Sequence, residues 1–167
     1  MNFKEISPKE IKDNLISMIS DEWMLISAGD ETAHNMMTAS WGFVGEMWGK
    51  GTVIAAVRPT RHTFGFLESN DTVALCFMGD NKEVHKICGS KSGRDIDKVK
   101  ETGLTPVYSQ GTMYFEEARL VIIAKKTYVD SLKPEGFIDS EANEKWYNND
   151  YHKMFYGEIL TVLEKQD

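Results

Sequence analysis

The stretch TVIAAVRPTRHTFGFLESN, residues 52–70, joins an apolar run to a polar corner and then to an amphipathic segment. The run at 52–57 is short and rich in β-branched residues, which is typical of a strand. Pro59 fixes its own φ and favours an extended Arg58, so we expect the strand to end at a rigid corner. A helix is expected to start after Thr60 or Arg61, with the backbone N–H groups of its first turn free.

This corner supports two interpretations. Free helix N–H groups, the helix dipole and the guanidinium groups of Arg58 and Arg61 together suit one phosphate. Alternatively, both arginines are solvated surface charges, and Thr60 or Thr63 only caps the helix. The segment by itself leaves the choice open.

The rest of the chain adds mainly strands, without repeats or linkers, so we expect one domain over residues 1–167. Ser7 and Glu10 form a capping box around Pro8, which predicts a helix over residues 8–19. Short helices between mainly antiparallel strands indicate a closed or half-open β-barrel with helical decoration. The predicted strands cover residues 23–29, 52–57, 72–78, 118–129 and 153–165, and amphipathic stretches lie near 62–69, 81–88 and 95–102.

Composition and charge narrow the classes of function. The formal net charge of −7 argues against broad binding to nucleic acid or to acidic membranes. Cys76 and Cys88 are the two cysteines, and they form no CxxC motif, so we expect neither a disulfide framework nor a four-ligand zinc site. The opening residues are too polar for a signal peptide, and the apolar runs are too short to span a bilayer. We therefore expect a soluble, cytoplasmic protein.

Several familiar chemistries lack their sequence motifs. The segment GFVGEMWGKG, residues 42–51, is glycine-rich but matches neither the dinucleotide-binding motif nor the P-loop. His85 and Cys88 have the spacing of half a metal site, but a catalytic zinc needs three protein ligands. No GxSxG motif is present. We expect no metal site and no hydrolase.

A second unusual segment, NMMTASWGFVGEMWG at residues 35–49, interleaves Met and Trp with small residues. Backbone groups of Thr38, Ala39 and Ser40 would suit the polar edge of a planar heteroaromatic ring, while Met or Trp covers its face. The alternative is that these apolar side chains belong to the core. The nearby corner at Arg58 and Arg61, which suits a phosphate, favours the ring site.

Five segments together resemble the flavin reductase-like family, and specifically its flavoredoxin-type branch. They are NMMTASWG (35–42), VRPTRHT (57–63), ICGSKSGRDIDK (87–98), YFEEARLVI (114–122) and NDYHKMFYGEI (149–159), in that family's order. The resemblance implies a mainly β fold, a six-stranded antiparallel Greek-key split barrel that binds FMN non-covalently and forms homodimers with the flavin near the subunit interface. It also implies that residues 38–41 line the isoalloxazine ring and that the arginine corner with SKS binds the phosphate end. The implied cofactor-binding residues are Thr38, Ala39, Ser40, Trp41, Arg58, Thr60, Arg61, Thr63, Lys91 and Ser92.

The chain departs from the family pattern at two positions. His62 stands where relatives commonly have an aromatic residue such as Tyr, which puts a stacking role at this position in doubt. Gly51 stands where a Pro is common, and this affects only a loop.

The segment SKSGRDIDK, residues 90–98, contains two groups of polar residues. Lys91 and Ser92 are a cation and a hydroxyl on a glycine-flanked loop, which suits a ligand. We interpret Arg94, Asp97 and Lys98 as a charged helix start.

The segment SEANEKWYNNDYH, residues 140–152, is acidic and aromatic. Trp146, Tyr147 and Tyr151 form either a lid over the cofactor or part of an interface, and their density favours an interface. His152 faces the flavin or its substrate, or it bonds across a dimer. The sequence leaves its role open.

The function that these features predict is redox chemistry on FMN, in which the cofactor carries the hydride and the protein sets its orientation. The first hypothesis is an NAD(P)H-dependent flavin reductase. The second is a flavoredoxin-like electron carrier that holds FMN permanently and exchanges electrons with a redox protein partner. A third is an FMN-binding protein with little turnover. The chain has no recognisable nicotinamide motif, so the sequence does not separate these hypotheses.

Overall fold

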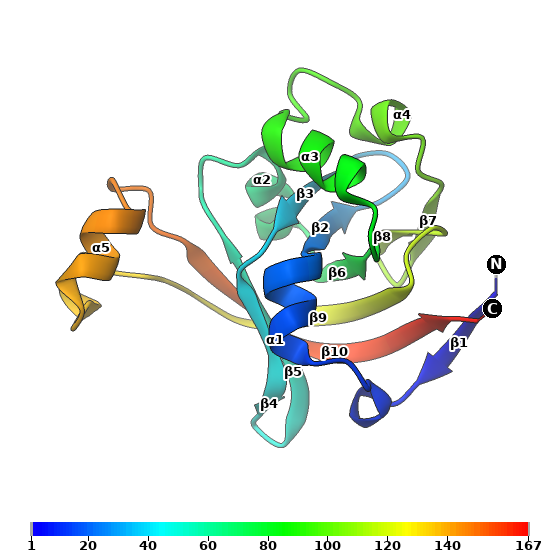
Figure 1. The fold of residues 1–167 in the computed structure, drawn as a ribbon, viewed down its shortest axis with the longest axis horizontal. Helices are drawn as coiled ribbons and strands as arrows, with labels where there is room; N and C mark the ends of the chain where they lie inside the picture. The colour runs from blue at the N-terminus through cyan, green and yellow to red at the C-terminus, as the bar shows by residue number, and fades with distance from the viewer. Residues whose placement is uncertain (1, 167) are drawn as a thin grey trace.

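The structure is a computed structural model that describes residues 2–166, and its sheets are built from antiparallel strands (Figure 1). One sheet contains β1 (Phe3–Ile6), β2 (Met24–Gly29), β3 (His34–Ala39), β4 (Gly42–Met47), β5 (Lys50–Val57), β6 (Thr72–Phe77), β9 (Leu120–Ser131) and β10 (Lys153–Lys165). The strands β7 (Pro106–Ser109) and β8 (Thr112–Phe115) form a separate hairpin.

The main sheet has the order β3-β2-β6-β9-β10-β5-β4, and β1 pairs with the C-terminal part of β10. Its two edges, β3 and β4, follow each other in sequence and are separated only by Ser40 and Trp41, yet they do not pair with each other. The sheet is therefore an open, split barrel, and the split lies at residues 40–41. The predicted fold class is confirmed, but the predicted count of six strands is wrong, because short strands such as β1 and β4 also join the sheet.

Two apolar cores lie on the two sides of the central strands, and this explains why β2 and β6 are buried along their whole length. Ile26, Leu75 and Ile122 form a row across β2, β6 and β9 that belongs to the barrel core. The adjacent row faces the opposite side and packs with residues of β8 and of the helices. Continuous apolar strands of this kind are typical of sheets that are covered on both faces.

Three short helices cover one end of the barrel. α2 (His62–Ser69) buries Thr63 and Leu67, α3 (Lys82–Ser90) buries Val84, His85 and Cys88, and α4 is Lys98–Thr102. The predicted helices at 62–69 and 81–88 are confirmed. The third begins later than predicted, because the side chain of Asp97 accepts a hydrogen bond from the Lys100 N–H and so caps the helix at that point.

The predicted continuous helix over residues 8–19 is wrong. The capping box of Ser7 and Glu10 is present, but it closes only a 3-10 turn at Pro8–Glu10. Asn14 then accepts hydrogen bonds from two following backbone N–H groups and starts a new turn, α1 (Leu15–Ser17), which continues as a π-helix at Met18–Glu22. An Asn side chain that bonds to its own backbone in this way competes with a continuous helix.

An arm extends from the body of the protein (Figure 1). It consists of the outer half of β9, a 3-10 turn at Pro134–Gly136, α5 (Ser140–Trp146) and the segment that leads into β10. The outer half of β9 is mostly exposed, and α5 has no buried residue. The arm therefore depends on a few specific contacts to hold it against the barrel. None of the helices in residues 2–166 combines the length and the apolar character that crossing a bilayer requires.

Candidate functional site

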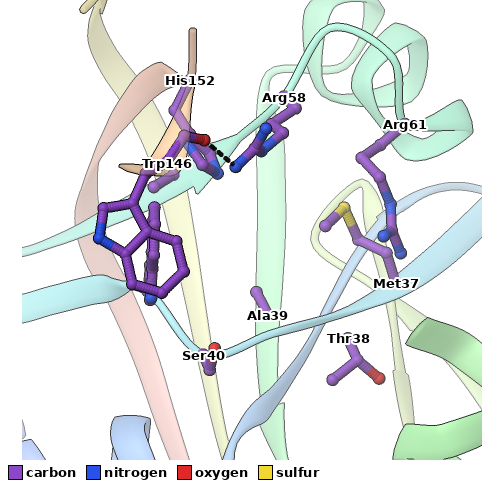
Figure 2. Close-up of a pocket in the computed structure, with 10 residues that line it drawn as sticks. Met37, Thr38, Ala39, Ser40, Arg58, Arg61, Trp146 and His152 are labelled. Atoms are coloured by element: carbon purple, nitrogen blue, oxygen red, sulfur yellow. Dashed lines mark hydrogen bonds between the residues drawn. The ribbon is translucent and has the colours of Figure 1, made fainter. Parts of the chain in front are cut away.

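The split of the barrel opens into a cavity of about 340 Å³, which we call the split pocket (Figure 2). The pocket collects residues from the edge strand β3, from the corner after β5 and from the arm. Its lining residues are Met37, Thr38, Ala39, Ser40, Trp41, Ala56, Arg58, Arg61, Trp146 and His152. Six of the ten residues that the sequence singled out are in this lining, namely Thr38, Ala39, Ser40, Trp41, Arg58 and Arg61.

The edge strand β3 forms one wall of the split pocket. Because β3 pairs only with β2, the backbone groups on its other side are not used by the sheet and are available to a ligand. The Thr38 hydroxyl has a structural task, since it donates to the His85 carbonyl at 2.8 Å. Thr38 therefore offers a ligand chiefly its backbone, and Ala39 has no polar side-chain atom; that backbone groups of residues 38–40 bind the polar edge of a ring stays a prediction.

The corner between β5 and α2 has the geometry that the sequence predicted. Arg61 is the N-cap residue of α2, its backbone is extended, and no side chain caps the helix. Both predicted threonine caps are therefore wrong. The Arg61 side chain extends from this corner toward Met37 of β3 (Figure 2).

The Arg61 guanidinium is partly buried and has no carboxylate partner among residues 2–166. It donates to the Cys88 carbonyl at 3.3 Å, and the ion pairs among residues 2–166 do not include it. Burial lowers the pKa of Arg61, and the Cys88 thiol acts against this shift. A desolvated cation beside an uncapped helix N-terminus is suited to bind an anion.

Arg58 is engaged differently, because it holds the arm. Its guanidinium forms an ion pair with Asp150 and donates to the Trp146 carbonyl at 2.9 Å, as the dashed line in Figure 2 shows. It also lies over the ring of Tyr147, 5.3 Å from the ring centroid. The cation that the sequence assigned to a phosphate is thus also the main polar link between the arm and the barrel.

The arm adds two aromatic side chains to the split pocket, Trp146 and His152. Trp41 contacts both, with ring centroids 5.1 Å from Trp146 and 5.0 Å from His152. His152 is buried, and its Nδ1 lies 2.8 Å from the Tyr147 hydroxyl. Burial lowers the pKa of His152 to about 4, with a smaller contribution from Arg58, so its imidazole is neutral at physiological pH.

Four of the residues predicted from the sequence lie outside the lining. Thr63 is buried and accepts a hydrogen bond from Asn35 at 2.8 Å, and Thr60 is exposed. Lys91 forms an ion pair with Glu101, and Ser92 accepts a hydrogen bond from the Arg94 backbone at 3.2 Å. Their roles as ligands stay predictions.

Of the other four lining residues, His152 was left open between the flavin and a dimer contact, and Met37, Ala56 and Trp146 were not assigned to the site from the sequence. Met37 lies in the segment that the sequence analysis singled out, so its place on β3 next to Thr38 was the available signal. For Trp146 the sequence favoured an interface. Trp146 follows Trp41 by more than 100 residues in the chain, so no local sequence pattern could predict that the two rings are in contact.

A larger, mostly apolar cavity of about 580 Å³ adjoins the split pocket. The two cavities share Ser40, Trp41, Ala56 and His152, so Trp41 and His152 stand between them. No charged side chain lines the second cavity among the described residues. Its other walls come from the first helical turns, the start of β4 and the arm, with Leu15, Ile16, Ile19, Phe43, Leu132 and Met154 among them.

Neither cysteine contributes to the split pocket. Both thiols are free and buried, and burial raises the pKa of Cys76 to about 12 and that of Cys88 to about 11. Thiols with such pKa values are poor nucleophiles at neutral pH. Residues 2–166 also contain no group of three or more His, Cys, Asp or Glu side chains placed to hold a metal ion.

Comparison with solved structures places this fold among flavoproteins. Flavoredoxin of Desulfovibrio vulgaris (Miyazaki F) is 19% identical, with a TM-score of 0.67 over 86% of this chain and 69% of that one. The FMN-binding protein from Thermus thermophilus with bound 1-cyclohex-2-enone is 19% identical, with a TM-score of 0.66 over 85% of this chain and 69% of that one. The Streptomyces globisporus C-1027 NADH:FAD oxidoreductase SgcE6 is 13% identical, with a TM-score of 0.64 over 86% and 75%.

At these identities the likeness to solved structures concerns the fold, and a search of curated proteins finds no match. The family assignment comes from the sequence itself. The model of the family described as "Flavin reductase like domain" matches residues 17–167, which is most of the chain and includes every part of the split pocket. The chain therefore belongs to the flavin reductase-like family.

Proposed function

We propose that this protein binds FMN in the split pocket and is an NAD(P)H-dependent flavin reductase. The observation that carries the proposal is Arg61, a partly buried guanidinium without a carboxylate partner, which lies at an uncapped helix N-terminus and faces the free edge of β3. A ligand with a phosphate at one end and a planar ring at the other matches this site, because the phosphate suits Arg61 at the helix N-terminus and the ring suits the free edge of β3. FMN is favoured over FAD because one terminal phosphate suits one compact basic corner.

The residues present fit such a ligand. The backbone of residues 38–40 would bind the polar edge of the ring, Trp41 and Trp146 would limit its access to water, and Arg61 with the α2 N–H groups would bind the phosphate. When bound, the flavin supplies the chemistry, acceptance and donation of a hydride or of electrons. The chain itself binds and orients, and neutral His152 adds no charge to the pocket.

The adjoining apolar cavity favours a reductase over a carrier. A carrier needs only an exposed flavin edge, whereas a reductase needs room for a second small molecule beside the ring. The cavity of about 580 Å³ lies directly behind Trp41 and His152 and would accommodate an uncharged ring such as nicotinamide. The flavoredoxin-like electron carrier is the alternative function, and the experiment must distinguish it from the reductase.

An anaerobic titration separates the two functions. The purified protein is loaded with FMN, NADH or NADPH is added, and flavin absorbance is followed by stopped flow. Bleaching within seconds supports the reductase. A flavin that ignores both nucleotides but accepts electrons from a reduced ferredoxin would identify a carrier, and calorimetry without any FMN or FAD binding would remove the proposal altogether.

We also propose a homodimer, because large apolar side chains are exposed on several elements. Phe43 and Trp48 on the β4–β5 hairpin are 61% and 62% exposed, and Ile138 on the arm is fully exposed. We expect a second copy of the chain to cover these side chains. Sedimentation that gives the chain mass of 19.0 kDa across micromolar concentrations would contradict this. A cytoplasmic location fits the two free thiols, and imaging of a fluorescent fusion tests it.

A further inference from the structure

Lys98 is a buried cation next to the split pocket that the sequence analysis interpreted only as part of a charged helix start. It is the first residue of α4, and only 5% of it is exposed. No carboxylate within residues 2–166 forms an ion pair with it. A buried ammonium is costly unless its surroundings compensate for its charge, so its position calls for an explanation.

The Lys98 ammonium connects the elements that shape the pocket. Its Nζ donates to the Met36 carbonyl of β3 at 2.8 Å and to the Cys88 carbonyl of α3 at 2.9 Å. The Cys88 carbonyl is also the acceptor for Arg61, so the two cations meet at one oxygen. Because β3 is an edge strand, such side-chain contacts take the place of a second neighbouring strand in fixing it.

We propose that Lys98 is a positioning residue of the split pocket, which fixes β3 and the Cys88 carbonyl to which Arg61 also donates, and which adds a positive charge behind Arg61 for the anionic end of the ligand. The proposal rests on the proposed function, since it assumes that the phosphate of FMN binds at Arg61. It explains why a lysine is buried here without an acidic partner. The bound phosphate supplies the missing negative charge.

The charge of Lys98 should depend on pH in the working range. Burial lowers the pKa of Lys98 to about 8, and the charge of Arg61 lowers it further while the Cys88 thiol acts in the opposite direction. The other groups that face this corner titrate elsewhere: the pKa of Cys88 is raised to about 11, that of His85 is lowered to about 4, and that of His62 is also lowered. Arg61 is a guanidinium and stays charged over this range, and the Asp97 side chain caps α4.

Proton binding and anion binding should therefore be linked. A bound phosphate stabilises the charged form of Lys98 and raises its pKa, so FMN affinity should fall as the pH rises from 7 to 9.5. The phosphate itself is already a dianion above pH 7, with its second pKa near 6, and does not contribute to this change. Riboflavin has the same ring and ribityl chain without the phosphate, so the ratio of the riboflavin to the FMN dissociation constant isolates the effect.

The experiment measures both dissociation constants by quenching of flavin fluorescence between pH 7 and 9.5, in the parent protein and in Lys98→Met and Lys100→Met. In the parent we expect the ratio to fall on the order of tenfold above pH 8. In Lys98→Met the ratio should be low at every pH and flat. Lys100→Met is the matched control, because Lys100 lies on the same helix, is exposed, and should leave the parent profile unchanged.

Three results would overturn the proposal. A parent ratio that stays constant from pH 7 to 9.5 excludes a role for the charge, and this measurement needs no variant that might misfold. Equal losses of FMN and riboflavin in folded Lys98→Met would mean that Lys98 only supports the fold. Equal pH profiles of this ratio in Lys98→Met and Lys100→Met would show that Lys98 has no specific role in FMN binding. If the parent binds neither flavin, the proposed function itself fails, which is a different result from a constant ratio.

Discussion

Replacing Arg61 by Gln tests the proposed phosphate site most directly. The side chain reaches into the split pocket from the corner before α2, and its hydrogen bond to the Cys88 carbonyl is long, at 3.3 Å. The substitution therefore removes a cation without breaking an ion pair of the fold. Gln keeps polar atoms at the position and can still donate to a carbonyl.

The expected loss follows from the type of contact. A hydrogen bond to a charged group contributes about 1.5–3 kcal/mol, and about 1.4 kcal/mol corresponds to a tenfold change in affinity. Arg61→Gln should therefore weaken FMN by roughly 10 to 100-fold. Riboflavin lacks the phosphate, so its affinity should stay within about twofold.

Arg58→Gln should behave differently, because Arg58 also holds the arm through Asp150 and the Trp146 carbonyl. Loss of these contacts frees Trp146 from the pocket, so riboflavin should weaken together with FMN. The sequence alone gives no reason for a loss of riboflavin, since neither interpretation of Arg58, as a phosphate ligand or as a solvated charge, links it to the arm.

Titration calorimetry with FMN and riboflavin measures both variants against the parent, with Lys4→Gln as a control that removes a cation from β1, at the other end of β10. Adding salt should weaken FMN binding to the parent more than riboflavin binding. The reasoning is refuted if Arg61→Gln weakens the two ligands equally, or if it leaves FMN affinity unchanged while the protein is folded.

Three further predictions concern the arm, the thiols and the buried histidines. Asp150→Asn keeps the bond from Arg58 to the Trp146 carbonyl, so the arm stays in place while Arg58 is released for an anion, and FMN binding should strengthen severalfold; weaker FMN binding would show that Asp150 instead orients Arg58. Cys76→Ser with Cys88→Ser should keep flavin turnover, and both native thiols should resist alkylation at pH 8, because burial raises their pKa values to about 12 and 11. Burial lowers the pKa values of His85 and His152 to about 4, so the unfolded chain binds protons first as the pH falls from 6.5 to 4. Urea melts should then show a loss of roughly 1–2 kcal/mol per histidine at pH 5 relative to pH 7.5, and a smaller loss in His152→Gln; equal losses would contradict the assignment.

The sequence by itself determined the local structure and the chemical type of the site. Short continuous apolar runs predicted the main strands, since such runs are typical of strands that are buried on both faces. Pro59 and the residues around it predicted the corner before α2, because a fixed φ acts within two residues. The prediction of one continuous helix over residues 8–19 is wrong for an equally local reason, because the side chain of Asn14 competes with the helical backbone hydrogen bonds there.

Only the tertiary structure decided how the arginines are used. Arg58 and Arg61 look equivalent in sequence, yet Arg58 pairs with Asp150, 92 residues away, while Arg61 is left without an acid. Likewise, Lys98 looks like an ordinary charge at a helix start, and only its burial against Met36 and Cys88 gives it a role. These contacts join segments far apart in the chain, and the folding of the sheet, not any local preference, brings them together.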